Sequence, residues 1–238
     1  MPKFFIDYIP EDTVLLTGEN ARHIGKSLRM KPGEEIVLCD GKGMDYGCII
    51  EEITADSVKC KIAFKTPTES ESKIKVSLYQ GLPKGDKLDT AIQKCVELGA
   101  YDIHPVIMER SISRPDEKSA KKKLLRLQKI SDEAAKQSRR GILPKVYPIE
   151  NYAAAINKIN ADLIILFYEK GGKKLKDILK AFTGKSIAII IGPEGGFAES
   201  EVQLAKDKGA VIATLGKRIL RTETAPIAAI AGIMYELD

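Results

Sequence analysis

Two loop sequences contain the residues best suited to chemistry. The first is Ile-Gly-Pro-Glu-Gly-Gly-Phe, residues 191–197, which directly follows an apolar run and precedes a helical pattern. Three glycines and a proline favour a tight turn with little side-chain bulk. A ligand could therefore approach the backbone there and meet the free N–H groups at the start of the next helix.

The second loop covers residues 215–225, Leu-Gly-Lys-Arg-Ile-Leu-Arg-Thr-Glu-Thr-Ala, and it also follows an apolar run. Its backbone could hydrogen-bond an adenine ring while Ile219 and Leu220 supply apolar contact. The alternative is a charged surface connection, in which an Arg221–Glu223 pair contributes little to stability.

A third segment, Leu-Phe-Tyr-Glu at 166–169, also ends an apolar run. We expect these three strand ends to share one pocket, because ligands of parallel α/β sheets bind at the carboxyl ends of the strands. Neither common nucleotide-binding pattern is present. The loop at 191–197 is not G-x-G-x-x-G, and the phosphate-loop pattern fails because Leu179 stands where its first glycine is required. A nucleotide-dependent enzyme of Rossmann type is therefore disfavoured.

Positive charge is concentrated in one stretch of the chain. Residues 110–145 contain twelve Lys/Arg and four Asp/Glu, a net charge of +8, whereas the whole chain of 238 residues carries +5. The remaining residues therefore carry −3. Such a segment suits a surface that faces phosphates, although a solvated helix face has the same composition.

The elements that must position these loops fall into two groups. Residues 1–70 show short strand patterns at 3–7, 13–16, 35–39, 47–53 and 57–64, with one short helix at 19–29. Closely spaced short strands predict a small barrel or sandwich. The polar stretch 66–73 is typical of a linker.

From residue 74 onward, strand and helix patterns alternate. Strands are predicted at 74–80, 103–108, 163–167, 187–191 and 211–215, the second interrupted by Pro105. Helices are predicted at 86–98, 115–140, 174–181, 199–208 and 224–236. This alternation predicts an α/β fold with a parallel sheet and helices on both faces.

The two loops, together with the runs at 97–103, 109–111 and 134–140, resemble the ribosomal RNA small subunit methyltransferase E family of the SPOUT class. The run from Ala21 to Ile24, with Leu28 and Arg29, resembles the family's PUA-like RNA-binding domain. The resemblance implies a PUA-like β-barrel at 1–70 and a SPOUT methyltransferase domain with a C-terminal trefoil knot at 74–238. It also implies S-adenosylmethionine-dependent methylation of N3 of a uridine in the decoding region of 16S ribosomal RNA, and a homodimer.

Site residues follow from the loops and the resemblance together. Arg221 is expected to stabilise a uracil anion, and Glu194 or Glu223 to take the proton or to orient that arginine. The expected cofactor-binding residues are Leu166, Phe167, Tyr168, Glu169, Gly192, Pro193, Glu194, Gly195, Gly196, Leu215, Gly216, Ile219, Leu220, Thr224 and Ala225. The expected RNA contacts are Arg22, His23 and Arg29 in the first domain and Arg110, Arg139 and Arg140 in the second, with an ordinary surface or packed role as the alternative for His23.

Other features narrow the class of protein. The four cysteines are scattered and only two histidines are present, so a metal site is not expected and the cysteines are interpreted as buried thiols. No apolar run reaches the ~18 residues of a membrane span, and the first residues do not form a secretory signal, so a cytoplasmic protein with no membrane partner is expected. An RNA-binding assembly protein without catalysis is the second hypothesis, but it leaves both glycine-containing loops without a role.

Overall fold

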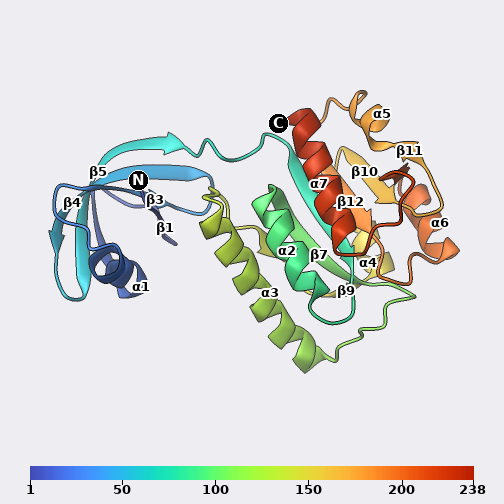
Figure 1. Ribbon diagram of the computed structural model, residues 1–238, viewed down its shortest axis with the longest axis horizontal. Coiled ribbons are helices and arrows are strands. Elements are labelled where there is room, and N and C mark those ends of the chain that lie inside the picture. Colours follow the sequence, from blue (N-terminus) through green and yellow to red (C-terminus); the bar gives the residue numbers. More distant parts are fainter. The chain divides into compact units, whose positions relative to one another are not determined.

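The computed structural model describes all residues, 1–238, and they form two compact units. The first unit comprises residues 1–71 and 135–143, and the second comprises residues 72–134 and 144–238. Figure 1 shows the elements of both along the chain. None of the helices combines the length and the apolar character that a membrane span requires.

The first unit is built on one five-stranded sheet with the order β1-β3-β4-β5-β2. Its elements are β1 (Lys3–Phe5), β2 (Thr13–Thr17), α1 (Gly18–Arg22), a π-helical turn (His23–Ser27), β3 (Glu35–Cys39), β4 (Met44–Ile53) and β5 (Ser57–Pro67). All neighbouring strands are antiparallel except β1 and β3. Alternate residues of these strands, such as Val14, Leu16, Ile36 and Leu38, enclose a small core with Ile24.

Several strands differ in length from the sequence patterns. The strand β5 extends to Pro67 and therefore includes the start of the stretch expected to be a linker. The expected helix at 19–29 is only five residues of α-helix followed by the π-helical turn. The chain leaves this turn through Arg29, which has a positive φ of 53°.

The second unit contains a fully parallel sheet with the order β11-β13-β10-β12-β6-β7-β8, and β9 also pairs with β7. Its strands are β6 (Lys75–Gly81), β7 (Ala100–Ile107), β8 (Lys145–Val146), β9 (Glu150–Asn151), β10 (Leu163–Phe167), β11 (Lys173–Lys174), β12 (Ser186–Ile191) and β13 (Val211–Thr214). Its helices are α2 (Lys87–Glu97), α3 (Glu117–Gln137), α4 (Tyr152–Asn157), α5 (Leu175–Leu179), α6 (Glu199–Asp207) and α7 (Thr224–Leu237), although the last residues of α3, 135–137, belong to the first unit.

Helices cover both faces of this sheet, as predicted. On one face, α4 and α6 pack against alternate strand residues, among them Leu166 and Ile190. On the other face, α2 and α7 pack against each other and against β6, β7 and β12 (Figure 1). Because both faces are covered, the central strands β10 and β12 are continuous apolar runs.

Pro105 does not interrupt β7, which runs through it from Ala100 to Ile107. On its outer side, β7 pairs with β8 at Asp102 and Ile103 and with β9 at Val106 and Ile107. Pro105 therefore lies where the outer neighbour changes, and its missing N–H removes no hydrogen bond to either short strand. The four cysteines are buried thiols, as expected.

A cavity at the carboxyl ends of three strands

The three loops singled out in the sequence meet around one cavity of about 480 Å³. They leave the carboxyl ends of β10, β12 and β13, and β10 lies between the other two strands in the sheet. The lining residues are Lys87, Phe167, Tyr168, Glu169, Ile191, Gly192, Pro193, Glu194, Gly195, Gly196, Phe197, Thr214, Leu215, Gly216, Lys217, Arg218, Ile219, Leu220, Arg221, Thr222, Glu223 and Ala225. The expectation of a shared pocket is therefore confirmed.

Glycines let the backbone of the 191–197 loop lie close to its neighbours. A Cβ atom on Gly81, the last residue of β6, would stand 2.6 Å from both N and Cδ of Pro193. A Cβ on Gly192 would stand 3.0 Å from the ring of Phe197, and Gly196 has a φ of +68°. Side chains at these glycine positions would therefore displace the backbone of the loop that forms this part of the cavity wall.

Glu194 is held by the start of α2. Its carboxylate accepts hydrogen bonds from Lys87 Nζ at 2.7 Å and from the backbone N–H of Lys84 at 3.2 Å. Partial burial raises the pKa of Glu194, but the hydrogen bonds from Lys87 and the backbone outweigh it and leave the pKa below its ordinary value. An ionised carboxylate that is already paired is a weak proton acceptor at neutral pH.

The segment from Arg221 to Glu223 presents three polar side chains with different surroundings. Arg221 is exposed at the cavity, whereas Thr222 is 7% exposed and its hydroxyl donates to the carbonyl oxygen of Gly192 at 2.8 Å. Glu223 lines the cavity, and its Oε2 is buried without a hydrogen-bond partner. A buried carboxylate oxygen of this kind is suited to accept a hydrogen bond from a bound molecule.

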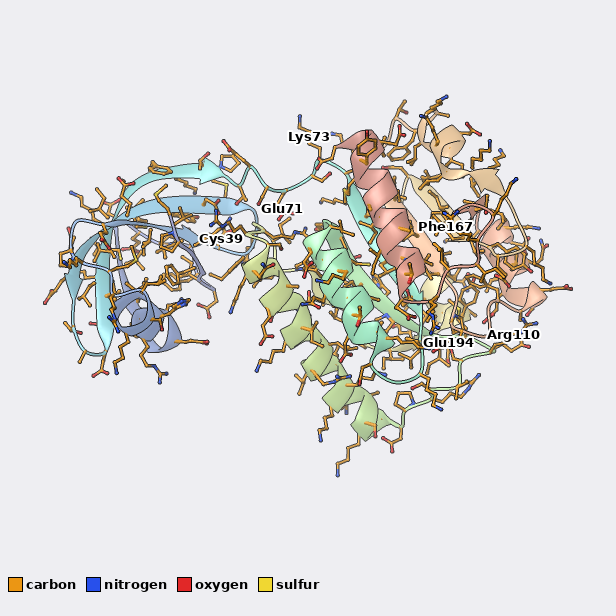
Figure 2. The ribbon with its side chains drawn as sticks, in the orientation of Figure 1. Cys39, Glu71, Lys73, Arg110, Phe167 and Glu194 are labelled. Atoms are coloured by element: carbon orange, nitrogen blue, oxygen red, sulfur yellow. The ribbon has the colours of Figure 1, made fainter.

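Arg110 lies beside the same cavity. Its Nη1 donates to the carbonyl oxygen of Gly195 at 3.2 Å, and its side chain is otherwise exposed. Figure 2 shows Arg110 and Glu194 near each other at this edge of the sheet. A cation is therefore available next to the opening of the cavity.

Most of the expected cofactor-binding residues line this cavity, but two do not. Leu166 is fully buried in the core, and Thr224 begins α7 without lining the cavity. The lining residues that the sequence reasoning missed are Lys87, Ile191, Phe197, Thr214, Lys217, Arg218 and Thr222. Thr222 stands inside a motif already singled out, whereas Lys87 comes from a separate helix and no local pattern indicates it.

The expected RNA contacts have different positions. Arg22 and Arg29 are exposed on the first unit, and His23 is exposed with its ring edge-on to Phe4 at 5.7 Å between centroids. Arg139 is also exposed, but it belongs to the first unit rather than the second. Arg29 and Arg139 are the two non-glycine residues of the chain with positive φ, at 53° and 57°.

Arg140 does not have the exposed position expected of an RNA contact. It is 4% exposed, and its guanidinium donates to both carboxylate oxygens of Glu71, at 3.1 Å from Nε and 2.6 Å from Nη2. Glu71 also accepts hydrogen bonds from the backbone N–H groups of Gly141 and Ile142. This buried ion pair does not support the expected RNA contact of Arg140, which stays a prediction, because its charge is used inside the first unit.

Comparison with known families gives two matches that together span most of the chain. Residues 70–234 match an RNA methyltransferase domain, and residues 16–63 match an RNA methyltransferase PUA domain. The first match contains all three loops of the cavity, and the second contains β3, β4 and most of β5 of the first unit.

Individual relatives are similar over the full length. The chain is 36% identical to the ribosomal RNA small subunit methyltransferase E of Bacillus subtilis, covering 100% of this chain and 98% of that protein. It is 32% identical to the protein of the same name from Buchnera aphidicola, covering 95% of this chain and 91% of the relative.

Solved structures agree with these matches. A crystal structure of ribosomal RNA small subunit methyltransferase E from Neisseria gonorrhoeae bound to S-adenosyl methionine is 37% identical, with a TM-score of 0.88 over 99% of this chain and 97% of that one. A Legionella pneumophila methyltransferase in complex with the cofactor SAM is 29% identical, with a TM-score of 0.81 over 98% and 96%. The cavity, its loops and these full-length matches together show that the chain belongs to the ribosomal RNA small subunit methyltransferase E family.

Proposed function

We propose that this protein transfers the methyl group of S-adenosylmethionine to N3 of a uridine in the decoding region of 16S ribosomal RNA. The observation that carries the proposal is the convergence of three strand-end loops on one cavity. The support from outside the chain is the family membership and the cofactor bound by the Neisseria gonorrhoeae relative. The protein then acts in the cytoplasm, in ribosome biogenesis.

The cavity fits the cofactor in size and chemistry. Its volume of about 480 Å³ lies in the range of ~300–1,000 Å³ that is common for small-molecule sites. The glycine-rich wall offers backbone groups, and the buried unpaired oxygen of Glu223 offers an acceptor. The proposed binding residues are those predicted from the sequence, with Leu166 and Thr224 supporting the wall from behind it.

The proposed chemistry divides between cofactor and protein. The sulfonium of S-adenosylmethionine supplies an already activated methyl group, so the protein must mainly align the acceptor. Uracil N3 carries a proton and becomes nucleophilic when that proton leaves. We assign stabilisation of the resulting negative charge to Arg221, which is exposed at the cavity and carries a permanent positive charge.

Of the two glutamates, Glu223 is the better candidate for holding the N3 proton. Its Oε2 is buried and unpaired at the cavity, whereas the carboxylate of Glu194 is occupied by Lys87 and Lys84. Glu194 is then a residue that orients the loop. The different surroundings of the two carboxylates support this division between the alternatives that the sequence left open.

RNA binding is assigned to both units. The PUA-like domain, proposed for residues 1–70, presents Arg22, His23 and Arg29, and the methyltransferase domain, proposed for 74–238, presents Arg110 beside the cavity. Arg139 joins the first group. Arginine is uncommon at positive φ, where glycine is the usual helix-ending residue, so Arg29 and Arg139 adopt this conformation at some local cost.

Two further features of the second unit support finer structural proposals. The α7 helix is apolar nearly all round, and its Tyr235 is 89% exposed, so we propose that α7 contributes to a homodimer interface. Light scattering that returned only a monomer would contradict this.

We also propose a trefoil knot around the 215–223 segment, which contacts Gly192 before α7 packs on β6 and β12. A crystal structure with an unthreaded chain would contradict the knot.

The decisive experiment is methyl transfer from labelled S-adenosylmethionine to purified small subunits and to naked 16S RNA, with mass mapping of the product. The proposal expects one methylated uridine whose mass fragments locate the methyl group on N3. An RNA-binding assembly protein without catalysis would bind the same RNA and transfer no label. Calorimetry with S-adenosylmethionine, NAD and ATP distinguishes a methyltransferase from the remaining alternative, a nucleotide-dependent enzyme of Rossmann type.

A further inference from the structure

Gln80 is a buried polar residue to which no role has been assigned. It is the penultimate residue of β6, and its side chain is 1% exposed. Its amide nitrogen donates to the hydroxyl of Thr222 at 3.0 Å and to the carbonyl oxygen of Gly81 at 3.1 Å. Both amide protons are therefore used, one of them on a residue 142 positions away in the sequence.

The hydrogen bonds around Thr222 can run in only one direction. The carbonyl oxygen of Gly192 has no proton, so the single hydroxyl proton of Thr222 must be donated to it. The hydroxyl oxygen must then accept from Gln80, and only the amide nitrogen of Gln80 can donate. The chain Gln80 to Thr222 to Gly192 is thus a directed relay in a buried site, where such bonds reinforce one another.

This relay joins two of the loops that line the cavity. Thr222 belongs to the 215–225 loop, and Gly192 begins the 191–197 loop. The backbones of β6 and the 191–197 loop are also in close contact, because Gly81 leaves no room for a Cβ beside Pro193. Gln80 and Thr222 therefore fasten both loops to the end of one rigid strand.

We propose that Gln80 and Thr222 are positioning residues for methyl transfer, and that they act by fixing Arg221 and Glu223. Thr222 stands between these two residues in the sequence, so the hydrogen bonds that hold it in place also hold the backbone from which both side chains start. The inference rests on the proposed function. A small displacement of groups that align a reaction can lower its rate by about a hundredfold.

The test compares isosteric variants. Thr222→Val and Gln80→Met keep the side-chain volume but remove the relay, and both are expected to lower kcat by about tenfold to a hundredfold. Thr222→Ser keeps the hydroxyl and is expected to restore most of the rate. Because one relay is broken in each case, the double variant should be no slower than Thr222→Val alone.

A readout independent of activity is amide hydrogen exchange of residues 192–197 and 215–223. Exchange in both loops should be faster in Thr222→Val and Gln80→Met than in the wild type, and close to wild type in Thr222→Ser. The matched control is Ser131→Ala, which removes another buried hydroxyl-to-carbonyl bond, to Pro144 at 2.7 Å, without touching the cavity. It should change neither exchange in the loops nor kcat.

The outcomes separate the two proposals. If the wild-type protein methylates no ribosomal substrate, the proposed function is contradicted. The amide exchange rates of the variants then show by themselves whether the relay holds the two loops in place. An active wild type with normal exchange and normal kcat in Thr222→Val and Gln80→Met overturns the inference. So does a double variant whose loss in kcat is the product of the two single losses.

Discussion

Arg140 and Glu71 form a two-pronged ion pair that is almost sealed from solvent, with side-chain exposures of 5% and 12%. Their neighbour Arg139 is exposed and has a positive φ. Two adjacent arginines of one basic motif therefore have different surroundings, and substitutions at the two positions should have different effects.

Removing Arg140 should destabilise the protein. Replacing Arg140 with Met leaves the buried carboxylate of Glu71 without its counterion, a loss of about 3 kcal/mol in the free energy of unfolding. Denaturant unfolding measures it. The double variant Arg140→Met with Glu71→Leu should recover part of the loss, since no charge is then left alone. Normal stability combined with weakened RNA binding would show that Arg140 contacts RNA after all.

Arg139→Gly should have effects of opposite sign on stability and on RNA binding. Glycine relieves the positive φ, so the free energy of unfolding should rise by up to about 1 kcal/mol. Loss of the cation should weaken binding to 16S RNA and lower the salt dependence of the affinity by about one unit of slope. Affinity titrations at several salt concentrations test this, with Lys73→Gly, outside the proposed RNA contacts, as the comparison. An unchanged slope would remove Arg139 from the RNA interface.

Substitutions of Arg221 and Glu223 should lower the rate of methyl transfer much more than the affinity for the cofactor. Arg221→Ala is expected to abolish methyl transfer and to leave the Kd for S-adenosylmethionine within about threefold of wild type, because catalysis depends on groups that act on the developing charge. Glu223→Gln keeps the shape but accepts a proton poorly, and it should lower kcat by about a hundredfold. Radiolabel transfer and calorimetry give the two quantities. Normal turnover in either variant would remove that residue from the mechanism.

Gly81→Ala should damage the cavity although residue 81 does not line it. The new Cβ would overlap with Pro193 backbone and ring atoms at 2.6 Å, so the 191–197 loop must shift. We expect at least about tenfold weaker binding of S-adenosylmethionine. Gly25→Ala is the control, since its Cβ would meet only Ile53 at an ordinary 3.5 Å. Equal affinities for the two variants would mean that the loop tolerates displacement.

The Lys87–Glu194 pair should be visible in a pH titration. The pKa of Glu194 lies below its ordinary value of 4.5, so the pair's contribution is complete above that pH and is lost as the pH falls through the lower pKa. Carbon NMR of the carboxyl group gives the midpoint. Lys87→Met removes the main hydrogen bond, and the midpoint should move upward. A titration midpoint of Glu194 that Lys87→Met leaves unchanged would show that the pair does not form in solution.

The hydrophobic pattern of the sequence predicts most of the longer helices and strands, but not the shortest ones. The bounds of β10 and β3 are those expected, because each strand is a short apolar run that ends at polar residues. The two-residue strands β8, β9 and β11 and the short α4 were missed, since two residues have no period. The pattern predicts α-helix over the π-helical turn at His23–Ser27, because five residues are too few to show a different period and such turns are rare.

The sequence predicts the loops that form the cavity, but not which distant side chains pair with one another. Glycine, proline and charge in two strand-end loops indicate where the cavity lies. The pairing of Glu194 with Lys87, of Thr222 with Gln80 and of Arg140 with Glu71 joins positions 69 to 142 residues apart. No local pattern carries such information, because it arises only when the chain has folded.

The membership of residues 135–143 in the first unit has a practical consequence for dissecting this protein. The polypeptide passes between the units three times, so no single cut yields two complete pieces. A fragment ending at residue 71 would lack Ile142, which bridges Lys42, and would leave the Glu71 carboxylate without its hydrogen bonds from residues 140–142. A complete first unit therefore needs the missing nine residues, 135–143, as a separate peptide or as a segment joined to residue 71.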